Sequence, residues 1–128
     1  MDDVSGATST LAEALRVALS TRDLDAFVAL LSDDVQWGDG KDARTCRGRS
    51  DVRATMDRAM ANGISGTITE LATGTKGILC GFDLQVPREH AGAGRRSLYH
   101  VYLVRDGRIY EIKPFDTRRS ATAAAGVA

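Results

Sequence analysis

The spacing of apolar side chains along the chain changes near residue 64. Before this point, apolar residues recur every three or four positions, which predicts amphipathic helices over residues 10–20, 24–33 and 51–61. A short strand at 35–37 separates the second helix from the third. After residue 64, apolar and polar residues alternate, a pattern typical of strands with one buried face. We therefore expect three helices and a short strand, followed by four further strands.

Residues with helix-capping side chains support these boundaries. Thr10 and Glu13 form a capping box for the first helix, and Asp23 can cap the second. The pair Asn62-Gly63 is typical of a helix end. The three helical segments thus have local signals as well as the right spacing.

The segment 97–116 is expected at the centre of the sheet. Tyr, Val, Ile and Leu fill both of its arms, and Asp106-Gly107 between them can supply the positive φ that hairpin turns require. Two further strands, at 67–72 and 78–86, precede it in the chain and are joined by a short turn. Together these segments predict an antiparallel sheet.

The loop length of the central hairpin decides which side chains share a face with His100. A two-residue loop, Asp106-Gly107, places His100 with Glu111 and Lys113. A three-residue loop with a glycine bulge gathers a different set: His100, Tyr102, Tyr110, Ile112, Pro114 and Asp116. We favour the bulged loop, because it leaves the two charged side chains on the outer face.

With the bulged loop, the outer face of the sheet is strongly apolar. It carries Tyr99, Val101, Leu103 and Ile109. Apolar patches of this kind mark protein interfaces. We therefore predict a homodimer that forms through this face.

The composition predicts a single domain without an electrostatic partner. The chain has 128 residues, 43% hydrophobic and 27% charged, and 17 basic residues balance 17 acidic ones. Such a neutral surface does not favour nucleic acid or anionic lipid. No apolar stretch reaches the length of a membrane span or signal peptide, so we expect a cytoplasmic protein. The expected boundaries are a flexible leader at 1–9, a domain at 10–117 and a flexible, alanine-rich tail at 118–128.

The cysteines and histidines do not form a metal-binding pattern. Cys46 and Cys80 are far apart in the sequence, and a disulfide is not expected in the cytoplasm. His90 has no potential ligand partners close to it in the sequence. We therefore predict neither a metal nor a cofactor.

Three stretches of the chain resemble the nuclear transport factor 2-like superfamily, in its SnoaL-like branch with polyketide cyclase-like and ketosteroid isomerase-like proteins of bacteria. They read RDLDAFVALLSDDVQWGD, CRGRSDVRATM and YHVYLVRDGRIYEIKPFD. The likeness spans residues 8–118. It implies a cone-shaped, cystatin-like α+β fold, in which three helices pack on a strongly curved antiparallel sheet around an apolar cavity. Because the superfamily includes many activities, the fold does not choose between them.

The resemblance implies roles for individual residues. Asp39 falls where ketosteroid isomerase-like members keep an aspartate base, and His100 where they place a protonated aspartate that binds the enolate oxygen. Leu15 stands where those isomerases have a second donor, a tyrosine, which argues against steroid isomerisation. Asp116 is the one match to the relay of limonene epoxide hydrolase-like members. In polyketide cyclase-like relatives a single acid or base acts on this side of the cavity, a role open to His100 or Asp116.

Each of these residues also has a purely structural interpretation. A carboxylate at the rim of an apolar cavity has a raised pKa, which suits Asp39 to proton abstraction, but Asp39 is equally a turn residue between two glycines. His100 can be a satisfied interior group. Asp116 can pair with Arg118 or Arg119 at the surface.

Two functions follow from this set of residues. The first is cofactor-free acid/base catalysis, an isomerisation or an aldol-type cyclisation, with Asp39 as base and His100 polarising a carbonyl. The second is a non-catalytic ligand-binding or dimerisation module. In both, the expected ligand is a small apolar molecule with carbonyl or hydroxyl groups. Its expected contacts are Trp37, Met56, Phe82, Tyr102, Ile112 and Asp116.

Overall fold

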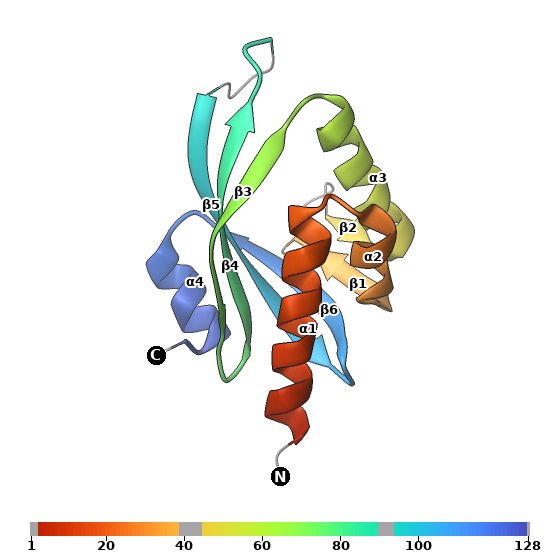
Figure 1. Ribbon diagram of the computed structural model, residues 1–128, viewed down its shortest axis with the longest axis vertical. Helices are drawn as coiled ribbons and strands as arrows, with labels where there is room; N and C mark the ends of the chain where they lie inside the picture. The colour runs from red at the N-terminus through yellow and green to blue at the C-terminus, as the bar shows by residue number, and fades with distance from the viewer. Residues whose placement is uncertain (1–2, 39–44, 90–93, 128) are drawn as a thin grey trace.

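The computed structural model describes residues 3–38, 45–89 and 94–127, which form four helices and six strands (Figure 1). In chain order these elements are α1 (Asp3–Ser20), α2 (Leu24–Ala29), β1 (Leu31–Trp37), β2 (Cys46–Arg47), α3 (Arg49–Ala61), β3 (Ser65–Thr73), β4 (Gly77–Val86), β5 (Gly94–Arg105), β6 (Arg108–Phe115) and α4 (Arg118–Ala125).

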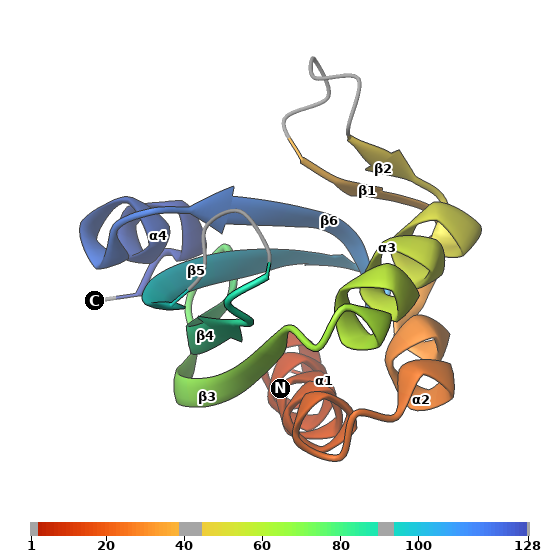
Figure 2. The same ribbon diagram turned by 90° about the horizontal axis from the view of Figure 1, so that it is seen from above.

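The strands form one curved sheet in the order β2-β1-β6-β5-β4-β3. Neighbouring strands are antiparallel, except that β1 runs parallel to β6. Helices α1, α2 and α3 lie on the concave side, and α4 lies on the opposite side (Figure 2). The predicted class, an α+β fold with helices packed on a strongly curved sheet, is confirmed, and the segment predicted at the centre supplies β5 and β6.

The main core lies between the first three helices and the concave face of the sheet. Alternation along β4 explains how the sheet contributes, since Ile78 and Cys80 enter this core while Leu79 points to the other side. The buried members of the core are Leu11, Ala12, Leu15, Ala18, Phe27, Leu31, Val35, Cys46, Val52, Ile78, Cys80, Tyr102, Ile109 and Ile112.

The helix signals in the sequence are correct in part. The Asp23 side chain caps α2, where its Oδ1 accepts a hydrogen bond from the Ala26 N–H at 3.1 Å. Helix α2 ends at Ala29, earlier than predicted, because the wholly buried Leu31 begins β1 and pairs with β6. Helix α1 begins at Asp3, so Thr10 lies inside it and is not its cap. The expected leader contains no proline that would stop the helix from extending toward the N-terminus.

The turn of the central hairpin has two residues, so the favoured three-residue loop is wrong. Arg105 pairs directly with Arg108, and φ is 53° at Asp106 and 76° at Gly107. Positive φ at both central residues is the signature of a type I′ turn, whose twist matches that of the flanking strands.

A bulge further along β6 nevertheless restores much of the predicted face. Val104 pairs with Ile109 and Leu103 with Glu111, so Tyr110 is the extra residue. Beyond it, Tyr102 pairs with Ile112 and His100 with Pro114, which puts these four residues on one face as expected.

The same bulge reverses two other assignments. Ile109 was expected on the outer face, but it is wholly buried in the main core. Tyr110 was expected beside His100, but its ring lies under the Arg105 guanidinium, 4.5 Å from the ring centroid. Since Arg105 belongs to the outer face, Tyr110 does too, and the outer and inner sets differ from those predicted.

Helix α4 covers the outer face that was expected to be free. Ala121 and Ala125 are wholly buried against Leu79 and Val101 and form a second core. The Lys76 N–H also donates to the carbonyl oxygen of Ala125 at 2.9 Å, which ties the helix to the β3–β4 turn. The segment 118–125, which was expected to belong to a flexible tail, forms a helix that packs on the sheet. The homodimer remains a prediction. The exposed apolar face from which it was inferred is covered by α4.

Substitution of Ala121 by aspartate should detach α4 from the sheet. An unpaired carboxylate at a wholly buried position has no room and no partner, and we expect the free energy of unfolding to fall by about 3 kcal/mol. The matched control is Ala123→Asp at an exposed position of the same helix, which should change stability by less than about 0.5 kcal/mol. Urea unfolding measures both values. Equal losses in the two variants would contradict the packing of α4 described above.

Candidate functional site

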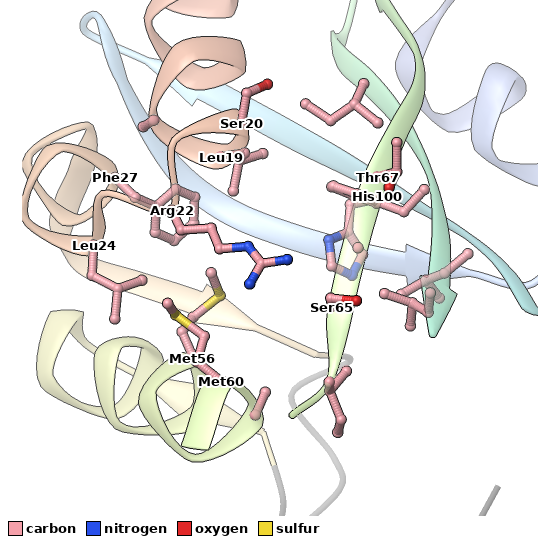
Figure 3. A pocket seen from close by; sticks show the side chains of 18 of the residues that line it. Leu19, Ser20, Arg22, Leu24, Phe27, Met56, Met60, Ser65, Thr67 and His100 are labelled. Atoms are coloured by element: carbon pink, nitrogen blue, oxygen red, sulfur yellow. The ribbon is translucent and has the colours of Figure 1, made fainter. Parts of the chain in front are cut away.

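A cavity of about 490 Å³ lies between the concave face of the sheet and helices α1, α2 and α3 (Figure 3). Its wall is mostly apolar. The residues that line it are Ala18, Leu19, Ser20, Arg22, Leu24, Phe27, Trp37, Met56, Ala59, Met60, Ile64, Ser65, Gly66, Thr67, Ile68, Phe82, Leu84, Leu98, His100, Tyr102 and Ile112. This size and character are typical of a pocket for a small molecule.

Most of the predicted site residues lie on this wall. The structure brings together Trp37, Met56, Phe82, His100, Tyr102 and Ile112. Asp116 does not line the cavity, because β6 ends at Phe115 and the exposed residues after it lead into α4. Asp39, the predicted base, lies outside the described residues. Ligand contact by any of these side chains stays a prediction.

Strand pairing places the inner aromatic residues next to one another. His100 and Tyr102 are two residues apart in β5, so both point to the concave face. Trp37 is the last residue of β1 and pairs with Ile112 of β6. Phe82, two residues beyond Cys80 in β4, reaches the same wall. The site therefore depends on four strands, β1, β4, β5 and β6, and β1 lies far from the other three in the sequence.

Three aromatic rings surround the imidazole of His100. The ring centroids of Trp37, Phe82 and Tyr102 lie 5.5, 5.3 and 5.9 Å from it, with interplanar angles of 81°, 68° and 84°. These edge-to-face contacts bury the imidazole, which is 8% exposed. Because aromatic rings take the place of water around His100, the positive charge of a protonated imidazole would be poorly solvated there.

Burial therefore keeps His100 neutral. It lowers the pKa of His100 from 6.5 to about 4. The Nδ1 atom lies 3.4 Å from the hydroxyl of Tyr102, and burial also raises the pKa of that phenol well above 10. The neutral imidazole carries one ring proton: in the Nε2–H tautomer the phenol donates to Nδ1, whereas in the Nδ1–H tautomer the phenol accepts from it. His100 is thus a neutral hydrogen-bond donor at neutral pH.

The two thiols do not supply a nucleophile. Burial raises the pKa of Cys80 to about 12, with a smaller contribution from Glu70, so its thiol stays protonated. Cys46 is buried, and its Sγ contacts the Thr55 hydroxyl at 3.0 Å. Within the ranges that the structure describes, no group of three or more His, Cys, Asp or Glu side chains could hold a metal. None of the described helices combines the length and apolar character needed to cross a bilayer.

The cavity wall includes polar residues that the sequence pattern did not reveal. Ser20 is the last residue of α1, Arg22 lies in the turn after it, and Ser65 and Thr67 come from the start of β3. Alternation along β3 could have assigned Ser65 and Thr67 to the same face of the strand, because they are two residues apart. No local signal distinguishes Arg22, because only the tertiary fold brings the α1–α2 turn over the sheet.

Solved structures of other proteins share this fold. A proposed polyketide cyclase from Xanthomonas campestris is 16% identical, with a TM-score of 0.71, and the match covers 94% of this chain and 98% of that one. A proposed ketosteroid isomerase from Kribbella flavida is 21% identical, with a TM-score of 0.70 and coverage of 88% and 79%. A Mycobacterium tuberculosis protein in complex with estradiol-17beta-hemisuccinate is 18% identical, with a TM-score of 0.65 and coverage of 88% and 95%.

At these identities the structural likeness shows the fold alone. No curated protein matches the sequence significantly. The family model of the SnoaL-like domain matches residues 12–112, which include the C-terminal half of α1, helices α2 and α3, strands β1 to β5 and most of β6. Because this match covers most of the chain, the protein belongs to the SnoaL-like domain family, as the resemblance of its sequence segments indicated.

Proposed function

We propose that the protein binds a small, mostly apolar molecule in the cavity and that His100 donates a hydrogen bond to a carbonyl or hydroxyl oxygen of that molecule. The observation that carries this proposal is the neutral imidazole, buried among three aromatic rings on the cavity wall. In an apolar site with little water, a fixed donor interacts more strongly with a developing negative charge than it does in water. The site therefore suits a carbonyl group that becomes an enolate.

The proposed chemistry is an isomerisation or cyclisation without a cofactor. A base removes a proton from the carbon next to the carbonyl, the C–H electron pair moves into a carbon–carbon double bond, and negative charge collects on the oxygen bound by His100. In an isomerisation the same proton then returns to another carbon. In a cyclisation the enolate carbon attacks a second carbonyl, and the alkoxide oxygen that forms there takes the proton from the base. Asp39 is the proposed base, on the strength of its sequence position.

A binding function without turnover is the second candidate. Leu15, at the position where ketosteroid isomerase-like members keep a tyrosine donor, is wholly buried and does not line the cavity. One of the two donors of that oxyanion site is therefore missing. The Mycobacterium tuberculosis relative is in complex with estradiol-17beta-hemisuccinate, and this supports small-molecule binding in the fold without requiring catalysis.

Proton exchange in deuterated water separates the two candidates. With 2-tetralone as a model ketone, we expect the wild-type protein to accelerate exchange of the protons next to the carbonyl, as followed by NMR. Asp39→Asn should lower this rate about a hundredfold while ketone binding persists. His100→Phe, which removes the donor, should lower it by about ten- to a hundredfold.

The matched control is Asp116→Asn, which makes the same change at an exposed aspartate outside the cavity. It should exchange protons at the wild-type rate. Binding of the ketone without any exchange in the wild-type protein would favour the non-catalytic candidate. Equal losses in Asp39→Asn and Asp116→Asn would contradict the role of Asp39.

The neutral state of His100 predicts a loss of stability in acid. Unfolded chains take up a proton on this residue near pH 6.5, whereas the folded protein does so only near pH 4. The unfolded state therefore binds more protons between these values, so the contribution is complete above pH 6.5 and is lost as the pH falls toward 4. The 2.5-unit difference between 6.5 and 4 corresponds to about 3 kcal/mol.

Urea unfolding at pH 7.5 and pH 4.5 measures this contribution. The wild-type protein should lose about 2–3 kcal/mol more than His100→Phe over this interval, because the variant has no imidazole to protonate. Carboxylates titrate in both proteins and cancel in the difference. Parallel pH dependence in the two proteins would show that His100 is not held neutral by burial.

A further inference from the structure

Arg22 is placed at the cavity by the turn that follows α1. Helix α1 ends at Ser20, the Thr21 hydroxyl donates to the carbonyl oxygen of Val17 at 2.8 Å, and Arg22 adopts a φ of 57°. This left-handed conformation is uncommon for a residue with a side chain and turns the chain sharply into α2. Figure 3 shows the Arg22 side chain extending into the cavity, with its guanidinium directed toward His100.

The guanidinium has no acidic partner among the described residues. Of the two acidic residues that follow it, Asp23 accepts the capping hydrogen bond of Ala26, and Asp25 pairs with Arg53 at 2.6 Å. No described residue forms a hydrogen bond or an ion pair with the guanidinium of Arg22. By contrast, several other arginines, such as Arg118 beside Glu70, are held by carboxylates of the protein. Arg22 is exposed and lines the cavity, so its charge faces solvent and is open to a ligand that enters the cavity.

The remaining cavity wall is neutral. Among its described residues, Arg22 is the only one that is charged at neutral pH, since His100 is neutral and no aspartate or glutamate is present. The hydroxyls of Ser20, Ser65 and Thr67 are neutral, and they give the wall further hydrogen-bonding groups. An apolar cavity with one cation suits an apolar molecule with one anionic group. A guanidinium matches a carboxylate in particular, because its parallel N–H groups can donate to both oxygens.

We propose that the natural ligand carries one carboxylate, which the Arg22 guanidinium binds, while its apolar body fills the cavity and its carbonyl or hydroxyl group faces His100. This inference rests on the proposed function, because both place the ligand in the same cavity. It adds the charge class of the ligand and its orientation. The two polar anchors, Arg22 on the helical side and His100 on the sheet, hold opposite ends of the molecule.

A pair of probes that differ only in charge tests this inference. 1-Naphthaleneacetate and its neutral analogue 1-naphthaleneacetamide have nearly the same shape and apolar area. Trp37 is the single tryptophan of the chain and lies on the cavity wall, so its indole N–H signal in the NMR spectrum reports binding of either probe. We expect the wild-type protein to bind the acetate about tenfold more tightly than the amide, with a preference that weakens as salt is added.

The variants assign this preference to one side chain. Arg22→Gln should abolish the preference by weakening binding of the acetate far more than binding of the amide, and Arg22→Lys should retain part of it. Arg119→Gln is the matched control, because it removes the same charge from an exposed position on α4, on the other side of the sheet. It should bind both probes as the wild-type protein does.

The possible failures are distinguishable. Equal affinity of the wild-type protein for acetate and amide would overturn the carboxylate inference and leave the proposed binding function standing. An equal loss of affinity for both probes in Arg22→Gln would also overturn it, because Arg22 would then only shape the cavity. Binding of neither probe at millimolar concentration would count against the proposed binding function and against this inference with it.

Discussion

The structure depends on the register of the central hairpin. Because side chains alternate along a strand, a slip of one residue between β5 and β6 would move every side chain that follows to the other face. The two-residue turn at Asp106-Gly107 starts the pairing, and the bulge at Tyr110 shifts it by one residue before Ile112 is reached. Only with this shift does Ile112 lie opposite Tyr102 on the concave face. The contribution of β6 to the cavity wall follows from that single irregularity.

The cavity combines an apolar interior with a small number of polar groups. The apolar surroundings determine the protonation state of those groups. The buried imidazole of His100 cannot retain a proton at neutral pH, since the aromatic rings around it replace water without solvating a charge. It can still donate one hydrogen bond, because a neutral imidazole keeps one N–H, and its Nδ1 lies 3.4 Å from the Tyr102 hydroxyl. A neutral donor of this kind stabilises negative charge on an oxygen without itself titrating in the physiological range. Arg22, at the more exposed side, carries the only permanent charge on the described wall.

The two faces of the sheet are used differently. On the concave face, three helices leave space for a cavity, whereas on the outer face α4 packs closely with the small side chains of Ala121 and Ala125 against Leu79 and Val101. Small residues allow the helix to approach the strands directly, and the carbonyl groups at its end bind the β3–β4 turn. Part of the convex side is therefore covered by the chain itself. The proposed ligand site lies on the concave side.

The sequence by itself determined the elements whose signals are local. Period located the first three helices, the Asp23 cap marked the start of α2, alternation located the strands, and the hairpin composition identified the centre of the sheet, while the motifs around Trp37 and His100 indicated the family. It could not locate the bulge at Tyr110, because pairing register depends on contacts between strands and has no local signature. It also missed α4, since alanines give little apolar contrast along a helix, and it missed Arg22, which only the packing of the α1–α2 turn over the sheet brings to the cavity. Tertiary structure decided these features because each depends on which distant segments pack together. The free energy of such long-range contacts cannot be read from any single stretch of the chain.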